Sequence, residues 1–74
     1  MDQAGAFLQA ILETPADDTP RLIFADWLDD QQEHARAEFI RLQISRHGLH
    51  PTDQRARQIR RRESELLSEH GEAW

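Results

Sequence analysis

The segment Arg21-Leu-Ile-Phe-Ala-Asp-Trp-Leu-Asp-Asp30 decides the fold, because apolar residues occupy almost every side of the helix that it would form. At about 100° per residue, these apolar side chains cover an arc of roughly 200°, which is wider than the stripe of an ordinary surface helix. The members of the arc are Ile23, Phe24, Ala25, Trp27 and Leu28. We therefore expect this segment to be the central helix, covered by others.

Leu22 falls outside this arc, on the side of the helix that carries Asp26 and Asp29, and it leaves two arrangements open. If a later helix covers Leu22, the acidic and basic parts of the chain close on each other. If it is exposed, it forms an acidic-rimmed apolar spot suited to the centre of an interface. We favour the covered arrangement, because a helix that is apolar all round is normally central.

The composition predicts one small soluble domain spanning residues 1–74. A chain of 74 residues has room for one small core, and without cysteine it contains neither disulfides nor thiolate zinc sites. No apolar run approaches the roughly 20 residues that span a bilayer, and the N-terminus lacks the basic region of a signal peptide. We therefore expect a cytoplasmic protein without membrane association.

The net charge of −5 is unevenly distributed along the chain. Residues 1–34 contain eight acidic residues and one arginine, whereas residues 35–74 contain eight arginines and six acidic residues. The two halves should therefore attract each other.

Apolar periodicity predicts helices on both sides of the central one. Thr14-Pro15 ends the first, because the residue before proline avoids the helical region. Thr19 suits the N-cap of the central helix with Pro20 at its first position, and Gly48 suits a left-handed cap after the third. No strand-like alternation occurs. The sequence thus predicts an all-α fold, a compact bundle of about four helices at roughly 3–13, 20–30, 35–47 and 53–70.

Polar residues interrupt the apolar faces of the last two helices and predict a structural polar network. Arg36 and Gln43 lie between two apolar flanks of the third helix, and Glu63 lies within the apolar face of the fourth. Polar groups that become buried need hydrogen-bond partners. We expect Arg36 to bond Asp26 or another acid of the central helix, and Glu63 to bond an arginine such as Arg36 or Arg41.

Three blocks of the sequence carry a family resemblance: Ala6-Phe-Leu-Gln-Ala-Ile-Leu-Glu13, Asp17-Asp-Thr-Pro-Arg-Leu-Ile-Phe-Ala-Asp-Trp-Leu-Asp-Asp30 and Arg36-Ala-Glu-Phe-Ile-Arg-Leu-Gln43. Together they closely resemble the bacterial repeat-companion domain, an uncharacterised helical family often found near the start of longer proteins with leucine-rich or similar repeats. One departure is Gln32-Glu-His-Ala35, where family members usually have a Gly-Asp turn. The resemblance implies an accessory module of a larger bacterial protein and transfers no catalytic residues.

The chemistry-bearing residues do not form a recognisable catalytic or metal site. The chain has four histidines without a His-Glu-x-x-His pattern, and it has no nucleophile elbow and no glycine-rich phosphate loop. The many carboxylates are typical of solvated helix faces and caps. We therefore expect no enzymatic activity, no cofactor and no bound metal.

Two classes of binding function remain. We favour a non-catalytic protein–protein interaction or adaptor module whose partner is a protein or an adjacent domain of the same chain, with Leu22, Leu49 and Trp74 as candidate contacts. The alternative is a small nucleic-acid-associated regulator that uses the arginine-rich fourth helix. The arginines of that helix spread around it and the chain is acidic overall, which disfavours the alternative.

Overall fold

The computed structural model describes residues 3–74, apart from the side chain of Ala73. The helices are α1 (Gln3–Glu13), α2 (Thr19–Asp30), α3 (His34–His47) and α4 (Gln54–His70), followed by the short 3-10 helix η1 (Gly71–Ala73). No strand occurs in residues 3–74. The prediction of an all-α bundle of about four helices is confirmed, and each predicted helix boundary lies within one residue of the observed one.

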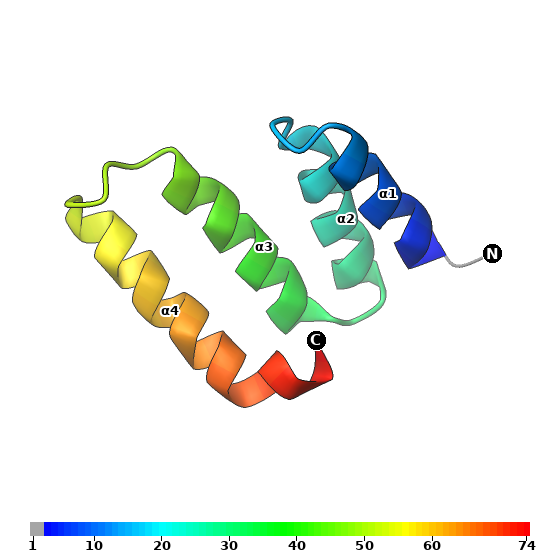
Figure 1. Cartoon of the computed structure of the whole chain (residues 1–74). Coiled ribbons are helices and arrows are strands. Elements are labelled where there is room, and N and C mark those ends of the chain that lie inside the picture. The colour runs from blue at the N-terminus through cyan, green and yellow to red at the C-terminus, as the bar shows by residue number, and fades with distance from the viewer. Residues whose placement is uncertain (1–2) are drawn as a thin grey trace.

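The helices pack in chain order, as Figure 1 shows: α1 against α2, α2 against α3, and α3 against α4. Over the described residues, the backbone of α4 contacts neither α1 nor α2. The molecule is therefore a curved layer of successive antiparallel helices, measuring 41 × 27 × 18 Å.

The core lies mainly between α2 and α3, where Phe24, Ala25, Leu28 and Ala37 are buried. Ala25 and Ala37 are fully inaccessible, and their small side chains let the two helices approach closely. The first helix joins this core through Phe7, whose ring centroid lies 5.7 Å from that of Phe24. Phe24 is thus the residue at which the first three helices meet.

Leu22 and Ile23 are 43% and 51% exposed, so the expectation that the fourth helix covers the central one is wrong. The reason is topological, because α4 packs on the side of α3 that faces away from α2 (Figure 1). Its own buried residues are Ala56, Glu63 and Leu66, which face α3. The arginines of α4 consequently do not reach the acids of α2.

The N-cap position of α2 lies one residue earlier than the sequence indicated, and the side chain that caps the helix lies two residues earlier. Asp18 occupies the N-cap position but its side chain makes no capping bond. The cap comes from Asp17, whose Oδ1 accepts a hydrogen bond from the Thr19 backbone N–H at 2.9 Å. This bond stabilises the carboxylate form and lowers the pKa of Asp17.

The turn between α2 and α3 contains Gln32, which at φ 62° is the one residue of the described chain outside glycine with a positive φ. The Gln32 N–H donates to the Asp29 carbonyl at 2.9 Å, and the Glu33 N–H donates to the Leu28 carbonyl at 2.8 Å. This pair of bonds is a Schellman motif, in which the left-handed position usually belongs to glycine. Gly48, expected to be left-handed, instead has φ −84°, so that expectation is wrong.

Gln32→Gly is expected to raise the free energy of unfolding by about 0.5–1 kcal/mol, since the left-handed conformation costs residues with a Cβ roughly 1–2 kcal/mol and glycine offsets part of that gain through unfolded-state entropy. Urea denaturation measures the change. The matched control is Gln58→Gly in the exposed interior of α4, which should lose about 1 kcal/mol. The same sign for both substitutions would contradict the assignment of strain to Gln32.

Candidate functional site

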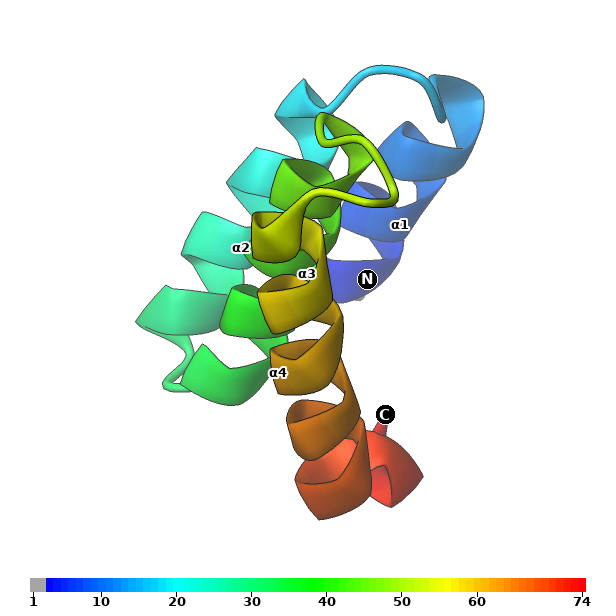
Figure 2. The same cartoon turned by 90° about the vertical axis from the view of Figure 1, so that its left-hand side faces the viewer.

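An apolar groove of about 330 Å³ lies on one face of the helical layer. Its floor comes from α2 and α3, and α1 and the C-terminal end of the chain form its sides. Figure 2 shows that α1 and the C-terminus project to the same side of α2 and α3. The apolar lining residues are Leu8, Ile11, Phe24, Phe39, Ile40, Leu67 and Trp74.

Trp74 reaches the groove because the chain turns back after α4. Directly after η1, the Trp74 N–H donates a hydrogen bond to the Gly71 carbonyl at 3.2 Å. The indole then stacks on His70 at a centroid distance of 5.7 Å and contacts the Phe39 ring of α3 at 5.3 Å. Trp74 remains 37% exposed, so one wall of the groove is an accessible aromatic surface.

Three of the large apolar residues that remain exposed in the described chain line this groove, whereas Leu12, Leu22 and Ile23 are exposed elsewhere. Leu8 of α1 and Leu67 of α4 are both large apolar residues that remain nearly half exposed, and both line it together with Trp74. Leu8 and Leu67 come from helices that do not contact each other. The groove thus lies between α1, which packs on α2, and the C-terminal end of the chain, which packs on α3.

The charged side chains that line the groove are those of Arg21 and Arg36, and no Asp or Glu among the described residues lines it. Arg21 is held in place, since its Nη1 donates to the Pro15 carbonyl at 2.7 Å. The Arg36 guanidinium lies over the Phe24 ring, 5.4 Å from its centroid, in a cation–π contact. Within residues 3–74, Arg36 makes no hydrogen bond or ion pair.

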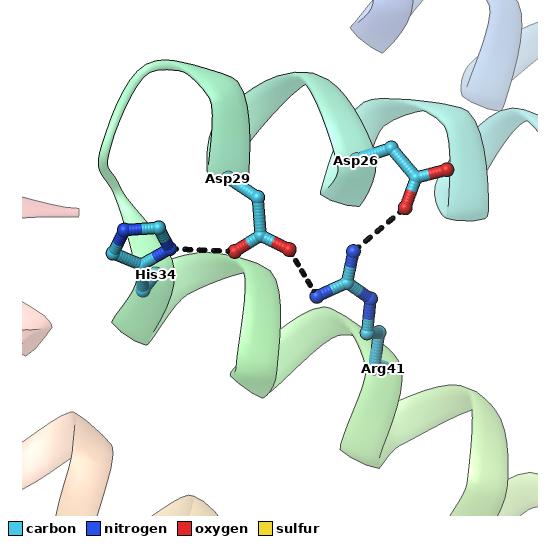
Figure 3. Close-up of polar contacts among 4 residues, drawn as sticks. All are labelled: Asp26, Asp29, His34 and Arg41. Carbon is cyan, nitrogen blue, oxygen red and sulfur yellow. Dashed lines mark hydrogen bonds and ion pairs between the residues drawn. The ribbon is translucent and has the colours of Figure 1, made fainter.

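The expected bond between Arg36 and Asp26 is therefore wrong, and Arg41 takes that place. Arg41 of α3 donates to Asp26 at 2.7 Å and also to Asp29 (Figure 3). Residues 36 and 41 lie about 140° apart around a helix. Arg36 consequently faces the groove, whereas Arg41 faces the acidic side of α2.

Asp29 contacts two polar side chains of α3 across the α2–α3 turn. Besides the Arg41 guanidinium it contacts Nδ1 of His34 at 2.9 Å, as Figure 3 shows. The bonds from His34 and Arg41 lower the pKa of Asp29, and the bonds to Asp29 and Asp26 raise the pKa of Arg41. Because Asp26 is largely exposed, we interpret this cluster as a surface clamp between two helices.

Ion pairs also join α3 to α4. The buried Glu63 carboxylate accepts a hydrogen bond from Nε of Arg46 at 2.8 Å, so its partner is an arginine as expected, but it is neither Arg36 nor Arg41. Side chains lean toward the N-terminus of their own helix, which brings Arg46 and Glu63 together in this antiparallel pair. Arg62 donates to both oxygens of Glu38, at 2.7 and 2.9 Å, and lowers the pKa of that carboxyl.

Acid is expected to weaken the fold through Asp29 and Glu38. Both pKa values are lower in the folded chain than their ordinary values of 3.8 and 4.5, so their stabilisation is present above those values and is lost as the pH falls through the lower folded values. Thermal melting from pH 7 to pH 2 should show a plateau followed by a fall below about pH 4.5. Asp29→Asn should make the fall in melting temperature with decreasing pH shallower.

The control for this experiment is Asp30→Asn, because Asp30 makes no ion pair with any residue the structure describes. Its profile should have the same shape as that of the unmodified chain. Identical profiles for the Asp29 and Asp30 variants would show that the clamp makes no contribution to acid sensitivity.

Of the three candidate contact residues, the structure brings only Trp74 into the groove. Leu22 is exposed on α2 outside the groove, and Leu49 is half-buried in the connection after α3. Sequence reasoning did not single out Leu8 and Leu67 as contact residues. Arg36 and Gln43 carried a usable signal, since their position between two apolar flanks indicated a surface between packed neighbours.

Most arginines of α4 are engaged within the chain. Arg55 bonds Asp53 at the N-cap, Arg60 donates to the Pro51 carbonyl at 3.3 Å, and Arg62 pairs with Glu38 and Glu65. Arg57 and Arg61 make no ion pair within the described part of the chain. They line a polar hollow together with Thr52, Gln54 and Gln58.

Within residues 3–74, no group of three or more His, Cys, Asp or Glu residues is placed to hold a metal ion. None of the helices described is long and apolar enough to cross a membrane. Comparison with protein-family models gives no match, and neither curated proteins nor solved structures give one. Function is therefore inferred from the groove and its chemistry.

Proposed function

We propose that the chain is a non-catalytic protein-interaction module that binds its partner in the groove. The observation that supports this is the gathering of exposed Leu8, Leu67 and Trp74 around one hollow. Contiguous exposed apolar surface marks interaction sites, and aromatic residues contribute disproportionately to binding energy. Trp74 against Phe39 supplies such an aromatic surface.

The polar residues of the groove favour binding over catalysis. They are Arg21, Arg36 and Gln43, none of which is a usual general base or nucleophile. Its volume is at the low end of the range of roughly 300–1,000 Å³ for small-molecule sites. Side chains projecting from a protein partner suit such a hollow.

We also propose a biological setting for the chain, as part of a larger protein. The resemblance of residues 5–43 to the repeat-companion domain favours an accessory module near the start of a larger bacterial protein, acting in the cytoplasm. The partner is then a separate protein or an adjacent domain of the same chain.

The test compares two leucines of α1 that are both exposed. Leu8 lines the groove, whereas Leu12 is 78% exposed and does not line it. We expect the immobilised chain and its Leu12→Asp variant to retain the same proteins from a bacterial lysate, and Leu8→Asp to lose them. Equal retention by both variants would exclude the groove as the binding surface.

A second candidate function rests on Arg57 and Arg61, which stand one turn apart on α4 in the polar hollow. Guanidinium groups without internal partners are available to phosphates. Retention on DNA or RNA that falls steeply with salt, and that Arg57→Gln/Arg61→Gln abolishes, would favour this function. The net charge of −5 opposes it.

A further inference from the structure

The groove offers a helix-binding surface instead of a strand-binding one. Both its floor and its sides consist of helices and their side chains, and residues 3–74 contain no sheet edge to which an extended peptide could add. An amphipathic helix presents apolar side chains at i, i+3, i+4 and i+7 along one face, which is the pattern that helical grooves accept. A fifth helix lying across α2 and α3 would cover the exposed groove residues of α1, α4 and the C-terminus.

The charged residues of the groove indicate the chemistry of its partner more specifically than its apolar residues do. The chain carries a net charge of −5, yet among the described residues the charged side chains that line the groove are both arginines. Arg36 is half-buried over Phe24 and lacks a carboxylate partner within residues 3–74. A guanidinium has five donors arranged to bind a carboxylate through two parallel hydrogen bonds.

Other arginines of α3 do not share this property. Arg41 pairs with Asp26 and Asp29, and Arg46 pairs with Glu63. An incoming carboxylate could bond Arg36 without breaking any ion pair of the described chain. The cation–π contact meanwhile fixes the guanidinium close to the apolar floor, so little side-chain freedom is lost on binding.

Gln43 is a second polar residue of α3 that lines the groove. It lies seven residues after Arg36, about 10.5 Å along the helix axis, and its amide makes no hydrogen bond with a described residue. Phe39 and Ile40 lie between the two and line the same groove. Along α3 the groove therefore presents a charged residue, then an apolar segment of about one turn, and then a neutral polar residue.

We propose that the groove binds an acidic amphipathic helix that places an Asp or Glu carboxylate against Arg36 and a polar side chain against Gln43, two turns away. This inference rests on the proposed function and names the partner's chemistry. The apolar face of the helix supplies the affinity, and the carboxylate selects the partner and its direction.

The test uses a designed helical peptide of about 18 residues, with leucine at i, i+3, i+4 and i+7 and one glutamate within that face, and a second peptide that differs only by Glu→Gln. Isothermal titration against the 74-residue chain should show the glutamate peptide binding about tenfold or more tightly, the effect expected of a charge-assisted hydrogen bond. The preference should disappear in Arg36→Gln and shrink in Arg36→Lys, since lysine cannot bond a carboxylate bidentately.

Two controls accompany the titrations. Arg60→Gln removes an arginine that lines neither the groove nor the polar hollow and should leave the preference unchanged, and circular dichroism reports whether each variant is folded. The comparison of the two peptides on the unmodified chain does not depend on the folding of any variant. Equal binding of both peptides, or binding of neither, would overturn the proposal.

The outcomes also separate this inference from the proposed function. If both peptides bind equally and Leu8→Asp abolishes both, the groove binds helices but Arg36 does not select carboxylates, so the interaction function stands and the acidic partner is wrong. If sedimentation shows a dimer that Leu8→Asp dissociates, a second copy fills the groove and the partner is again wrong. If Leu8→Asp affects neither peptide binding nor lysate capture, both proposals fail.

Discussion

Phe24→Ala is expected to remove a large part of the stability of the chain and to lower its melting temperature sharply. Phe24 is 2% exposed and its ring contacts Phe7, Trp27 and the Arg36 guanidinium, so its removal opens a cavity where three helices meet. Truncating a buried phenylalanine costs about 3–5 kcal/mol. A chain of 74 residues has a total stability of roughly 4–11 kcal/mol, so the loss consumes much of it.

Far-ultraviolet circular dichroism during a thermal melt measures this effect. The control is Ile23→Ala, which removes a large apolar side chain from the adjacent position of the same helix. Because Ile23 is about half exposed, we expect a loss of about 1 kcal/mol or less. Similar melting curves for the two variants would mean that the centre of the core does not lie at Phe24.

Arg46→Ala is expected to cause the second largest loss of stability, because it leaves the Glu63 carboxylate without its partner. Glu63 is 8% exposed, and without Arg46 its carboxylate would remain in the α3–α4 interface with no ion-pair partner in the described chain. Breaking a buried pair costs about 3–5 kcal/mol. Arg46 is itself partly exposed, so we expect the lower end, about 3 kcal/mol.

A double variant separates the loss of attraction from the cost of the stranded charge. Arg46→Leu/Glu63→Leu removes both charges and should recover most of the stability lost by Arg46→Ala, because apolar replacement of a buried pair is often neutral. Arg57→Ala is the surface control and should change the free energy of unfolding by no more than about 0.5 kcal/mol. A loss in Arg46→Ala no larger than in this control would contradict a structural role for the pair.

Helix positions could be predicted from the sequence because their signals are local. Pro15 and Pro20 bracket the first connection, and apolar periodicity marks the helix faces within a few turns. The cap at Asp17 was missed because Asp18 and Thr19 are equally suitable capping residues, and the left-handed Gln32 was missed because this position usually belongs to glycine. Both features depend on the backbone conformation at the helix ends.

The pairing of helices could not be predicted in the same way. The apolar arc of α2 is compatible with a helix surrounded on all sides, but α4 packs on the far face of α3 and leaves Leu22 and Ile23 exposed. This arrangement also decides the ion pairs, since Arg41 and Arg46 face the acids that Arg36 was expected to meet.

Only part of the groove was visible in the sequence. Arg36 and Gln43 stood out because they interrupt apolar flanks, and Trp74 because it follows the helix-ending Gly71. Their common location depends on the fold of the last turn, which brings Trp74 onto Phe39 of α3. The absence of contact between α4 and α1 likewise created the space that Leu8 and Leu67 border.

Packing in chain order also affects how the chain folds. Every helix contacts only its neighbours in sequence, through connections at residues 14–18, 31–33 and 48–53, so each contact closes a short loop. Chains dominated by such local contacts fold in microseconds to milliseconds. Because α1 is anchored to α2 alone, it can detach and reattach while α2, α3 and α4 remain assembled. Amide hydrogens of α1 should then exchange with solvent faster than those of α3, which is held on both sides.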